Sequence, residues 1–335
     1  METRKIQLTG GSTFTVSLPK RWAKEHGLES GARMHLYPHS DGSLLVRPDP
    51  TNNGDREITL TVDHRSETDI VQTVRAGYVS GFDKIALVAT GGIDDTQRRA
   101  VTRTVDGLIG LEVVSETKRR IVLQSLLNTR DVSIRQTVIQ LQRVTLSMHE
   151  NAVTAAIDED SELVTRVRNR DDEADRLFGM VSRHYQQSLS DLQAIDQLDI
   201  DRSSIADYYT TAQQLERVAD HAEKMAVIAE CLDASATETI QNFDSIARSA
   251  RGIVTDASSV LLAGADVEMA YRALDDRDAL LTELDRSDKQ LYHSDSSDQH
   301  PVGLLLDSVR RTSEYGGNIA EAMIQRAVRT GTLSE

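Results

Sequence analysis

From residue 129 to residue 329, apolar positions recur every three or four residues, which is the spacing of one face of a helix. Breaks rich in aspartate, glycine and serine divide this stretch, so the pattern predicts six helices at 130–157, 162–190, 203–233, 238–263, 267–293 and 302–329. Helices with a single apolar stripe bury it by packing against one another. The region 128–335 is therefore predicted to be an all-α repeat of two three-helix bundles.

Residues 55–126 alternate between strand and helix patterns. EITLTV and DKIALVA are typical of strands, SETDIVQTVRAGYVS and IDDTQRRAVTRTVDGL of helices, and LEVVSE with RRIVLQ of a hairpin. This order predicts a small α/β connecting domain. Gly91 and Gly92 follow a strand and precede a helix, but the lysine and the further glycines of a nucleotide-binding loop are missing. We expect no phosphate-binding role for this glycine pair.

Residues 1–50 contain only short strand patterns, in RKIQL, FTVSL, RMHLYP and SLLVRP, around a short helix from Lys20 to His26. The helix follows Pro19 and ends at Gly27. A piece of this size buries too little apolar surface to be stable alone, so we expect it to form a homodimer. The prolines and polar residues of 48–55 predict a linker to the next domain.

Composition adds information about charge and environment. The chain has 53 acidic and 38 basic residues and a formal net charge of −15, yet residues 1–50 carry seven basic and five acidic residues, a net charge of +2. The abundance of aspartate and of arginine over lysine resembles proteins of salt-loving archaea, whose acidic surfaces suit strong salt. No apolar run approaches the length of about 18 residues that spans a bilayer, so we expect a cytoplasmic protein without membrane insertion. The single cysteine, Cys231, is expected to be a core or near-core thiol.

Two pairs of carboxylates stand out within the helical region. Asp171 and Asp175 lie four residues apart in one predicted helix, and Glu216 and Asp220 do so in the next. Residues i and i+4 are neighbours on one helix face, and each pair lies one residue beside an apolar stripe. If the two helices are neighbours, four carboxylates converge on one rim, which suits a metal ion with oxygen ligands.

A second interpretation remains open on the residues alone. With 53 acidic residues among 335, carboxylate pairs at this spacing also occur by chance. Nearby arginines would then turn the pairs into ordinary surface ion pairs, each contributing roughly 0.3 to 0.5 kcal/mol; these arginines are Arg168, Arg170, Arg176 and Arg217.

The order Asp171-x-x-x-Asp175, then Glu216-x-x-x-Asp220-His221-Ala222, resembles the paired acidic motifs of the PhoU family of phosphate-signalling proteins. The resemblance implies two three-helix bundles with metal bound by the acidic pairs. The sequence does not identify the metal, since iron, zinc, manganese and magnesium all fit oxygen ligands. It also implies partners, namely a phosphate ABC transporter ATPase or a signalling protein. His221 points about a hundred degrees away from Asp220, so we expect it to be a hydrogen-bonded structural histidine facing a neighbouring helix.

In the last predicted helix, RRTSEYGGNIAEA resembles the same motif helix. On that register Arg310 replaces Glu216 and Glu314 replaces Asp220, while upstream Asp285 is followed four residues later by Lys289. An Arg-x-x-x-Glu pair suits a salt bridge better than a cation. We therefore expect no metal in the second bundle, and close helix packing at Gly316 and Gly317.

The SLPKRW motif, Gly27-Leu28 and the final hairpin of the first fifty residues resemble the AbrB-type swapped-hairpin domain. That resemblance implies two interleaved chains with a basic face on DNA. The residues expected to contact phosphates are Arg4, Lys5, Lys20, Arg21 and Lys24. The alternative is that this domain serves only dimerisation or partner recognition.

The sequence shows no nucleophile and base arrangement, nucleotide loop or catalytic metal triad, so we expect a regulator and not an enzyme. The first hypothesis is a DNA-binding regulator of phosphate uptake with a metal-binding PhoU-like domain. The second is an adaptor that dimerises through residues 1–50 and binds a transporter or signalling partner without contacting DNA. A carboxylate-metal enzyme of the ferritin kind is disfavoured because its Glu-x-x-His element is missing.

Overall fold

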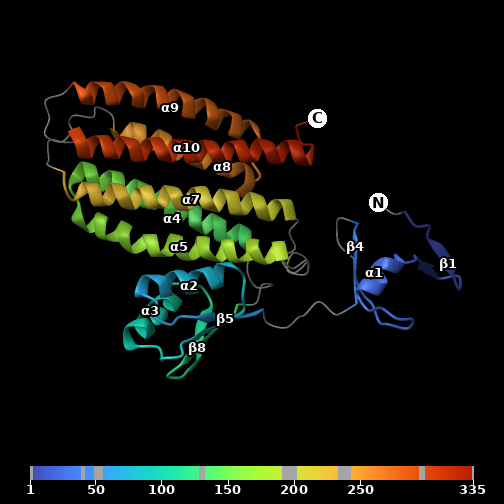
Figure 1. Ribbon diagram of the computed structural model, residues 1–335. Coiled ribbons are helices and arrows are strands. Elements are labelled where there is room, and N and C mark those ends of the chain that lie inside the picture. Colours follow the sequence, from blue (N-terminus) through green and yellow to red (C-terminus); the bar gives the residue numbers. More distant parts are fainter. Residues whose placement is uncertain are drawn as a thin grey trace. The chain divides into compact units, whose positions relative to one another are not determined.

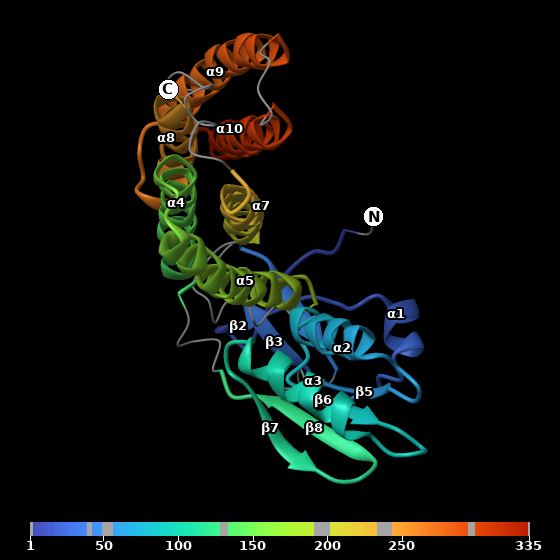
Figure 2. The ribbon, with the colours of Figure 1, turned by 90° about the vertical axis from the view of Figure 1, so that its left-hand side faces the viewer.

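The computed structural model describes residues 3–38, 42–48, 56–127, 133–190, 202–232, 243–293 and 299–333. The chain forms two compact units, Met1–Asp55 and Arg56–Glu335. Figures 1 and 2 show the elements of each unit in two orthogonal views. The predicted fold class is confirmed: a short-stranded N-terminal region is followed by an α/β region and then by a helical region.

The first unit contains two antiparallel hairpins and one short helix. β1 (Gln7–Thr9) pairs with β2 (Thr13–Thr15), and β3 (His35–Pro38) pairs with β4 (Leu44–Arg47), with α1 (Lys20–Glu25) between the hairpins. No residue of this unit that the structure describes is buried. Large apolar side chains are exposed instead, among them Ile6, Leu8, Phe14 and Leu36. The described residues of a single copy of this unit therefore form no hydrophobic core of their own.

The α/β region is a four-stranded sheet packed against two helices. The strand order is β5 (Glu57–Thr61), β6 (Lys84–Val88), β8 (Arg120–Ser125) and β7 (Leu111–Glu116), with β5 and β6 parallel and the other pairs antiparallel. α2 (Glu67–Val79) connects the parallel strands, and α3 (Asp95–Asp106) packs beside it. Capping boxes at Ser66 and Asp94 fix where these helices begin. The elements and their order agree with the sequence pattern.

The loop with Gly91 and Gly92 is organised around a carboxylate of the same chain. Asp63 accepts hydrogen bonds from the backbone N–H groups of Thr90 at 2.8 Å and Gly91 at 3.3 Å. The Thr90 hydroxyl donates to the same oxygen and is the main reason that the pKa of Asp63 lies below its usual value. These donors already have an anionic partner, so the loop has a structural explanation.

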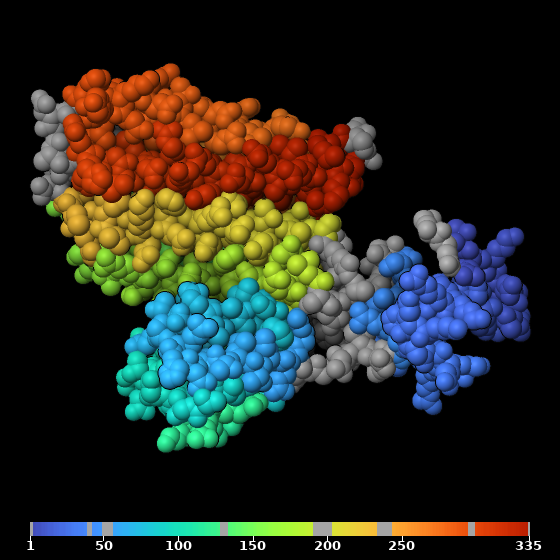
Figure 3. Space-filling view, viewed as in Figure 1, coloured from blue at the N-terminus to red at the C-terminus, as the bar shows by residue number. Residues whose placement is uncertain are grey.

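The remaining helices form one continuous apolar core. α4 (Ile134–Asp158), α5 (Ser161–Ser190) and α7 (Arg202–Ala229) pack against one another, as do α8 (Phe243–Leu262), α9 (Glu268–Tyr292) and α10 (Gln299–Thr330). α10 also packs along α7 and joins the two groups. In the space-filling view the α/β region lies against α5, where α2 contacts that helix (Figure 3). None of the helices within the described ranges is both long and apolar enough to cross a membrane.

Two helix boundaries differ from expectation for identifiable reasons. α10 begins at Gln299, so Pro301 lies inside its first turn, where the missing N–H would have had no partner within the helix. α7 ends at Ala229, which leaves Cys231 in the following turn. Cys231 is exposed, so the expectation of a core or near-core thiol was wrong.

Several expected features fall outside the described residues. They are most of the linker before residue 56, the first residues of the helices expected to begin at 130 and 238, and much of the breaks at 191–201 and 294–301.

Candidate metal site

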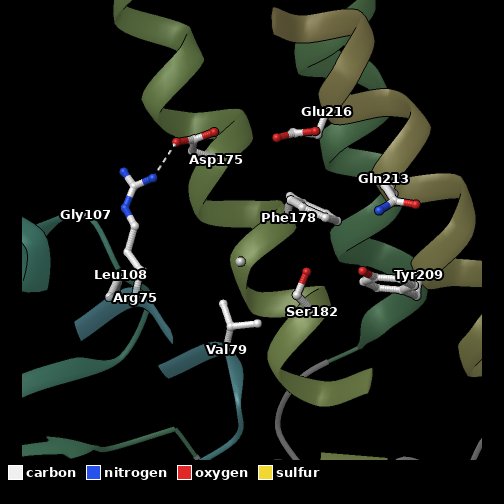
Figure 4. A pocket seen from close by; sticks show the side chains of 11 residues that line it. Arg75, Val79, Gly107, Leu108, Asp175, Phe178, Ser182, Tyr209, Gln213 and Glu216 are labelled. Carbon is white, nitrogen blue, oxygen red and sulfur yellow. Dashed lines mark hydrogen bonds and ion pairs between the residues drawn. The ribbon is translucent and has the colours of Figure 1, made fainter. Parts of the chain in front are cut away.

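α5 and α7 bring predicted carboxylates together at one rim of the first bundle. Their apolar stripes pack into the core, since Ala174 of α5 and Val218 of α7 are buried. Asp175, Glu216 and Asp220 lie one residue or two beyond these stripes. One carboxylate oxygen from each of the three lies within 4.8 Å of the others. Figure 4 shows Asp175 and Glu216 facing each other across the gap between the helices.

Three carboxyl groups of this rim have raised pKa values, which indicates that a positive charge nearby would stabilise their ionised forms. Partial burial, followed by repulsion from Asp220 and Asp175, raises the pKa of Glu216 to about 7. Partial burial and then the charge of Glu223 raise the pKa of Asp171 to about 7. Burial likewise raises the pKa of Asp220. Such carboxylates gain from a bound cation, which offsets both the burial and the mutual repulsion.

Asp171, the fourth predicted ligand, lies one turn before Asp175 on α5. It is not part of the group of three whose oxygens meet. Its Oδ1 atom is buried and has no hydrogen-bond partner within the part of the chain that the structure describes. Asp171 therefore borders the site and presents an oxygen that a cation or a water molecule could satisfy.

Glu223 is a further carboxylate of the rim that the sequence reasoning missed. It raises the pKa of both Asp171 and Asp220. Glu223 follows Asp220 by three residues and Glu216 by seven, so helical spacing alone could have placed it on this face.

The arginines named in the alternative interpretation mostly have other partners. Arg168 forms a two-pronged pair with Glu230, and Arg170 donates to Ser147 and lies 3.6 Å from Glu173. Arg176 donates a hydrogen bond to the backbone of its own helix. Arg217 lies over the ring of Tyr315, and its charge lowers the pKa of Glu216 and Asp220. Simple pairing with these four side chains does not account for the acidic rim.

An arginine from the α/β region does reach the rim. Nη1 of Arg75, on α2, lies 3.3 Å from Oδ2 of Asp175 and donates a hydrogen bond to it. The dashed line in Figure 4 marks this contact between the two regions. Among the residues that the structure describes, no ion pair with an arginine is seen for Glu216 or Asp220, although the charge of Arg217 lowers the pKa of both. The donor set that remains consists of carboxylate oxygens, which fit a hard or borderline divalent cation.

The second bundle has a guanidinium where the first has its carboxylates. Nη2 of Arg310 lies 2.9 Å from Asp285 and 2.8 Å from Asp288, both on α9. The Arg-x-x-x-Glu spacing had suggested a salt bridge between Arg310 and Glu314. In the structure, Glu314 pairs with Arg311 instead, at 2.9 Å. At this place of the second bundle, Arg310 thus supplies positive charge to Asp285 and Asp288 from the chain itself.

His221 turns away from the acidic rim, as predicted. Its ring lies 5.7 Å from the Tyr315 ring of α10, measured between centroids. Its Nδ1 atom is buried without a hydrogen-bond partner among the described residues, so the hydrogen bond expected for this histidine is not formed at that atom.

The predicted DNA-contacting residues are all exposed in the first unit. Lys20, Arg21 and Lys24 lie on α1, whereas Arg4 and Lys5 precede β1. Arg21 also pairs with Glu25 at 2.8 Å, one turn along the same helix. The basic side chains are accessible, and part of their charge is offset locally.

Two separate parts of the chain are similar to known protein families. Residues 138–229 match the family model of the PhoU domain, and residues 7–53 match that of "Antidote-toxin recognition MazE, bacterial antitoxin". The crystal structure of PhoU from Pseudomonas aeruginosa is similar with a TM-score of 0.47 and 23% identity, over 59% of this chain and 96% of that one. No curated protein matches significantly. The first segment of the chain is thus similar to the MazE family and part of its helical region to the PhoU domain, which agrees with the order of the motifs in the sequence.

Proposed function

We propose that the protein is a regulator of phosphate uptake that binds DNA through its first unit and a metal ion through its PhoU domain. The observation that carries the proposal is the presence of both family matches in one chain, with the acidic rim inside the PhoU match. This combination couples a candidate nucleic-acid-binding segment to a domain of a phosphate-signalling family.

The metal ion would be held by Asp175, Glu216 and Asp220, with Asp171 completing the donor set. Raised pKa values and the proximity of three carboxylates support a cation at this place. A bound divalent ion supplies fixed positive charge between α5 and α7, so it would stiffen the first bundle. Iron, zinc, manganese and magnesium all accept such oxygen ligands.

The first unit would act as a homodimer. Without a buried residue in its described part, it needs a second copy to cover side chains such as Leu8 and Phe14. In such a dimer the positive charges of both copies would lie on one surface, and this surface would attract the phosphate groups of DNA. The residues proposed for these contacts are Arg4, Lys5, Lys20, Arg21 and Lys24.

An adaptor without DNA contact is the second candidate function. The description of the matched family is recognition of a toxin, which is a protein partner. The pairing of Arg21 with Glu25 also reduces the charge available for phosphates. In this case the first unit only dimerises, and the helical region binds a phosphate ABC transporter ATPase or a signalling protein.

Fluorescence anisotropy with labelled promoter DNA of phosphate-transport genes distinguishes the two functions. A shuffled duplex serves as competitor, and the salt concentration is varied because phosphate contacts weaken steeply with salt. The regulator predicts selective binding that the double variant Lys20→Ala, Arg21→Ala abolishes. A matched control, Arg33→Ala with Arg47→Ala, removes the same charge elsewhere in the unit and should retain selectivity. Equal binding to both duplexes would favour the adaptor.

A further inference from the structure

A pocket with a volume of about 330 Å³ lies where the α/β region meets the first bundle, within the second unit. α2 and the residues after α3 form one wall, and α5 and α7 form the other (Figure 4). Ligand sites typically have volumes of roughly 300 to 1,000 Å³ and often lie between domains. The size and position of this pocket therefore suit a small organic molecule.

Much of the pocket lining is apolar. Val79 and Leu108 contribute from the α/β region, and Phe178 contributes from α5. The ring of Phe178 stacks with that of Tyr209 at a centroid distance of 6.0 Å, and both rings line the pocket. A flat or aliphatic ligand body would pack against this surface and be removed from water.

The charged groups of the pocket favour a positive ligand. Two carboxylates, Asp175 and Glu216, line it together with one guanidinium, that of Arg75. Arg75 already pairs with Asp175, whereas Glu216 faces the pocket next to Asp220, so the lining has one more acidic than basic group. An anion placed here would meet that negative field, and a cation would be stabilised by it.

We propose that this pocket binds a small organic cation, with an amidinium or ammonium group beside Glu216 and Asp175 and an apolar body against Phe178 and Leu108. Such a ligand contacts both the α/β region and the bundle, so its binding adds to the stability of their contact. The inference does not depend on a metal site. Because the two proposed sites share Asp175 and Glu216, however, a metal ion and the organic cation exclude each other.

Isothermal titration calorimetry of the full-length protein with three probes of equal shape tests the charge preference. Benzamidine carries a positive group at neutral pH, benzamide is neutral and benzoate is negative. We expect benzamidine to bind at least about tenfold more tightly than benzamide, and benzoate not to bind measurably. Equal binding of benzamidine and benzamide, a preference for benzoate, or no benzamidine binding would each overturn the proposal.

Variants locate the probe and test the role of each charge. Glu216→Gln keeps the shape of a half-buried side chain and should weaken benzamidine binding by about tenfold. Arg75→Ala removes the partner of Asp175 and should strengthen benzamidine binding. If the pocket were an anion site, the same variant would weaken the binding of benzoate. Gln213→Phe narrows the pocket without changing a charge and should weaken binding. The control Arg99→Ala lies outside the lining and should have no effect.

Two further outcomes distinguish binding in the pocket from binding at the acidic rim alone. If Gln213→Phe leaves benzamidine affinity unchanged, the probe binds only at the acidic rim and the pocket proposal is wrong. Adding Mn²⁺ should reduce the apparent benzamidine affinity if the metal proposal also holds. Benzamidine binding that follows the variants but ignores Mn²⁺ would refute the shared metal site and leave the organic cation site intact.

Discussion

Arg310 of α10 lies 2.9 Å from Asp285 of α9, in the register where the first bundle has Glu216 opposite α5. The arginine is largely enclosed, with 22% of its side chain exposed; burial lowers its pKa, but the hydrogen bonds that it donates to Asp288 and Asp285 outweigh this effect and raise the pKa. The second bundle thus carries its own cation at this place. The first bundle has carboxylates at the corresponding place. An external cation would therefore be stabilised in the first bundle and is not required in the second.

We therefore expect metal binding to depend on the first bundle alone. Replacing Asp220→Asn removes a carboxylate from the group of three and should weaken Mn²⁺ binding by at least about tenfold. The measurement is calorimetric titration of metal-free protein. Asp285→Asn removes the same charge from the second bundle and serves as the control, with unchanged Mn²⁺ affinity. Loss of affinity in the control but not in Asp220→Asn would place the site elsewhere.

Local patterns in the sequence predicted most of the fold and part of the site. The three-and-four spacing of apolar residues located the helices, because burial of one face imposes that period. The same period placed Asp175, Glu216 and Asp220 on the rim, and it would have placed Glu223 there as well. The distinction between Arg310 and Glu216 was also visible in the register of the repeat.

Contacts between distant segments were not predictable in this way. Arg75 and Asp175 are 100 residues apart, as are Asp83 and Arg183. No periodic pattern links such positions, since they meet only when the α/β region docks on α5. The pocket follows from the same docking and was therefore also beyond the reach of the sequence.

The buried arginine at this docking surface should contribute strongly to stability. Arg183 is 2% exposed and donates to the carbonyl oxygens of Tyr78 and Phe82 and to the carboxylate of Asp83. Arg183→Met removes these three hydrogen bonds and the charge that faces Asp83, which should lower the free energy of unfolding by about 3 to 5 kcal/mol. Urea denaturation measures the change.

A half-exposed arginine of the same helix provides the control. Arg168 pairs with Glu230, and each side chain is 42% exposed. Arg168→Met should change the free energy of unfolding by no more than about 1 kcal/mol. Similar losses for both variants would mean that the contact between the α/β region and α5 contributes little.

Close packing of α10 against α8 makes Gly316 intolerant of a side chain. A Cβ atom there would lie 2.8 Å from Cγ2 of Ile253 and 3.0 Å from the backbone nitrogen of Val254. Gly316→Ala should therefore lower the free energy of unfolding by about 1 to 3 kcal/mol. Thermal and urea unfolding report this loss.

Gly252 of α8 is the matched control, because an added Cβ atom there meets nothing within 4 Å. Gly252→Ala should raise the free energy of unfolding by about 0.5 to 1 kcal/mol, since alanine favours the helix. Destabilisation by both variants would contradict the packing argument.

A buried histidine should make the helical region sensitive to acid. His149 is fully buried, and its pKa is lowered from 6.5 to about 3 by burial and then by the charges of Arg251 and His221. The unfolded chain takes up a proton at this residue below pH 6.5, whereas the folded protein does not until about pH 3. The contribution of His149 to the free energy of unfolding should therefore fall as the pH falls through this window, by up to about 1.4 kcal/mol per pH unit, whereas carboxylates with raised pKa values such as Glu216 act in the opposite direction.

Denaturant unfolding at several pH values tests this effect through the slope and not the absolute stability. His149→Gln lowers stability at neutral pH by disturbing the core. Between pH 6.5 and pH 4, however, the variant should lose less free energy of unfolding per pH unit than the wild type. The control His293→Gln changes an exposed residue at the end of α9 and should keep the wild-type slope. A slope that His149→Gln leaves unchanged would show that other groups cause the acid sensitivity, because the amide of glutamine cannot take up the proton that the imidazole takes up.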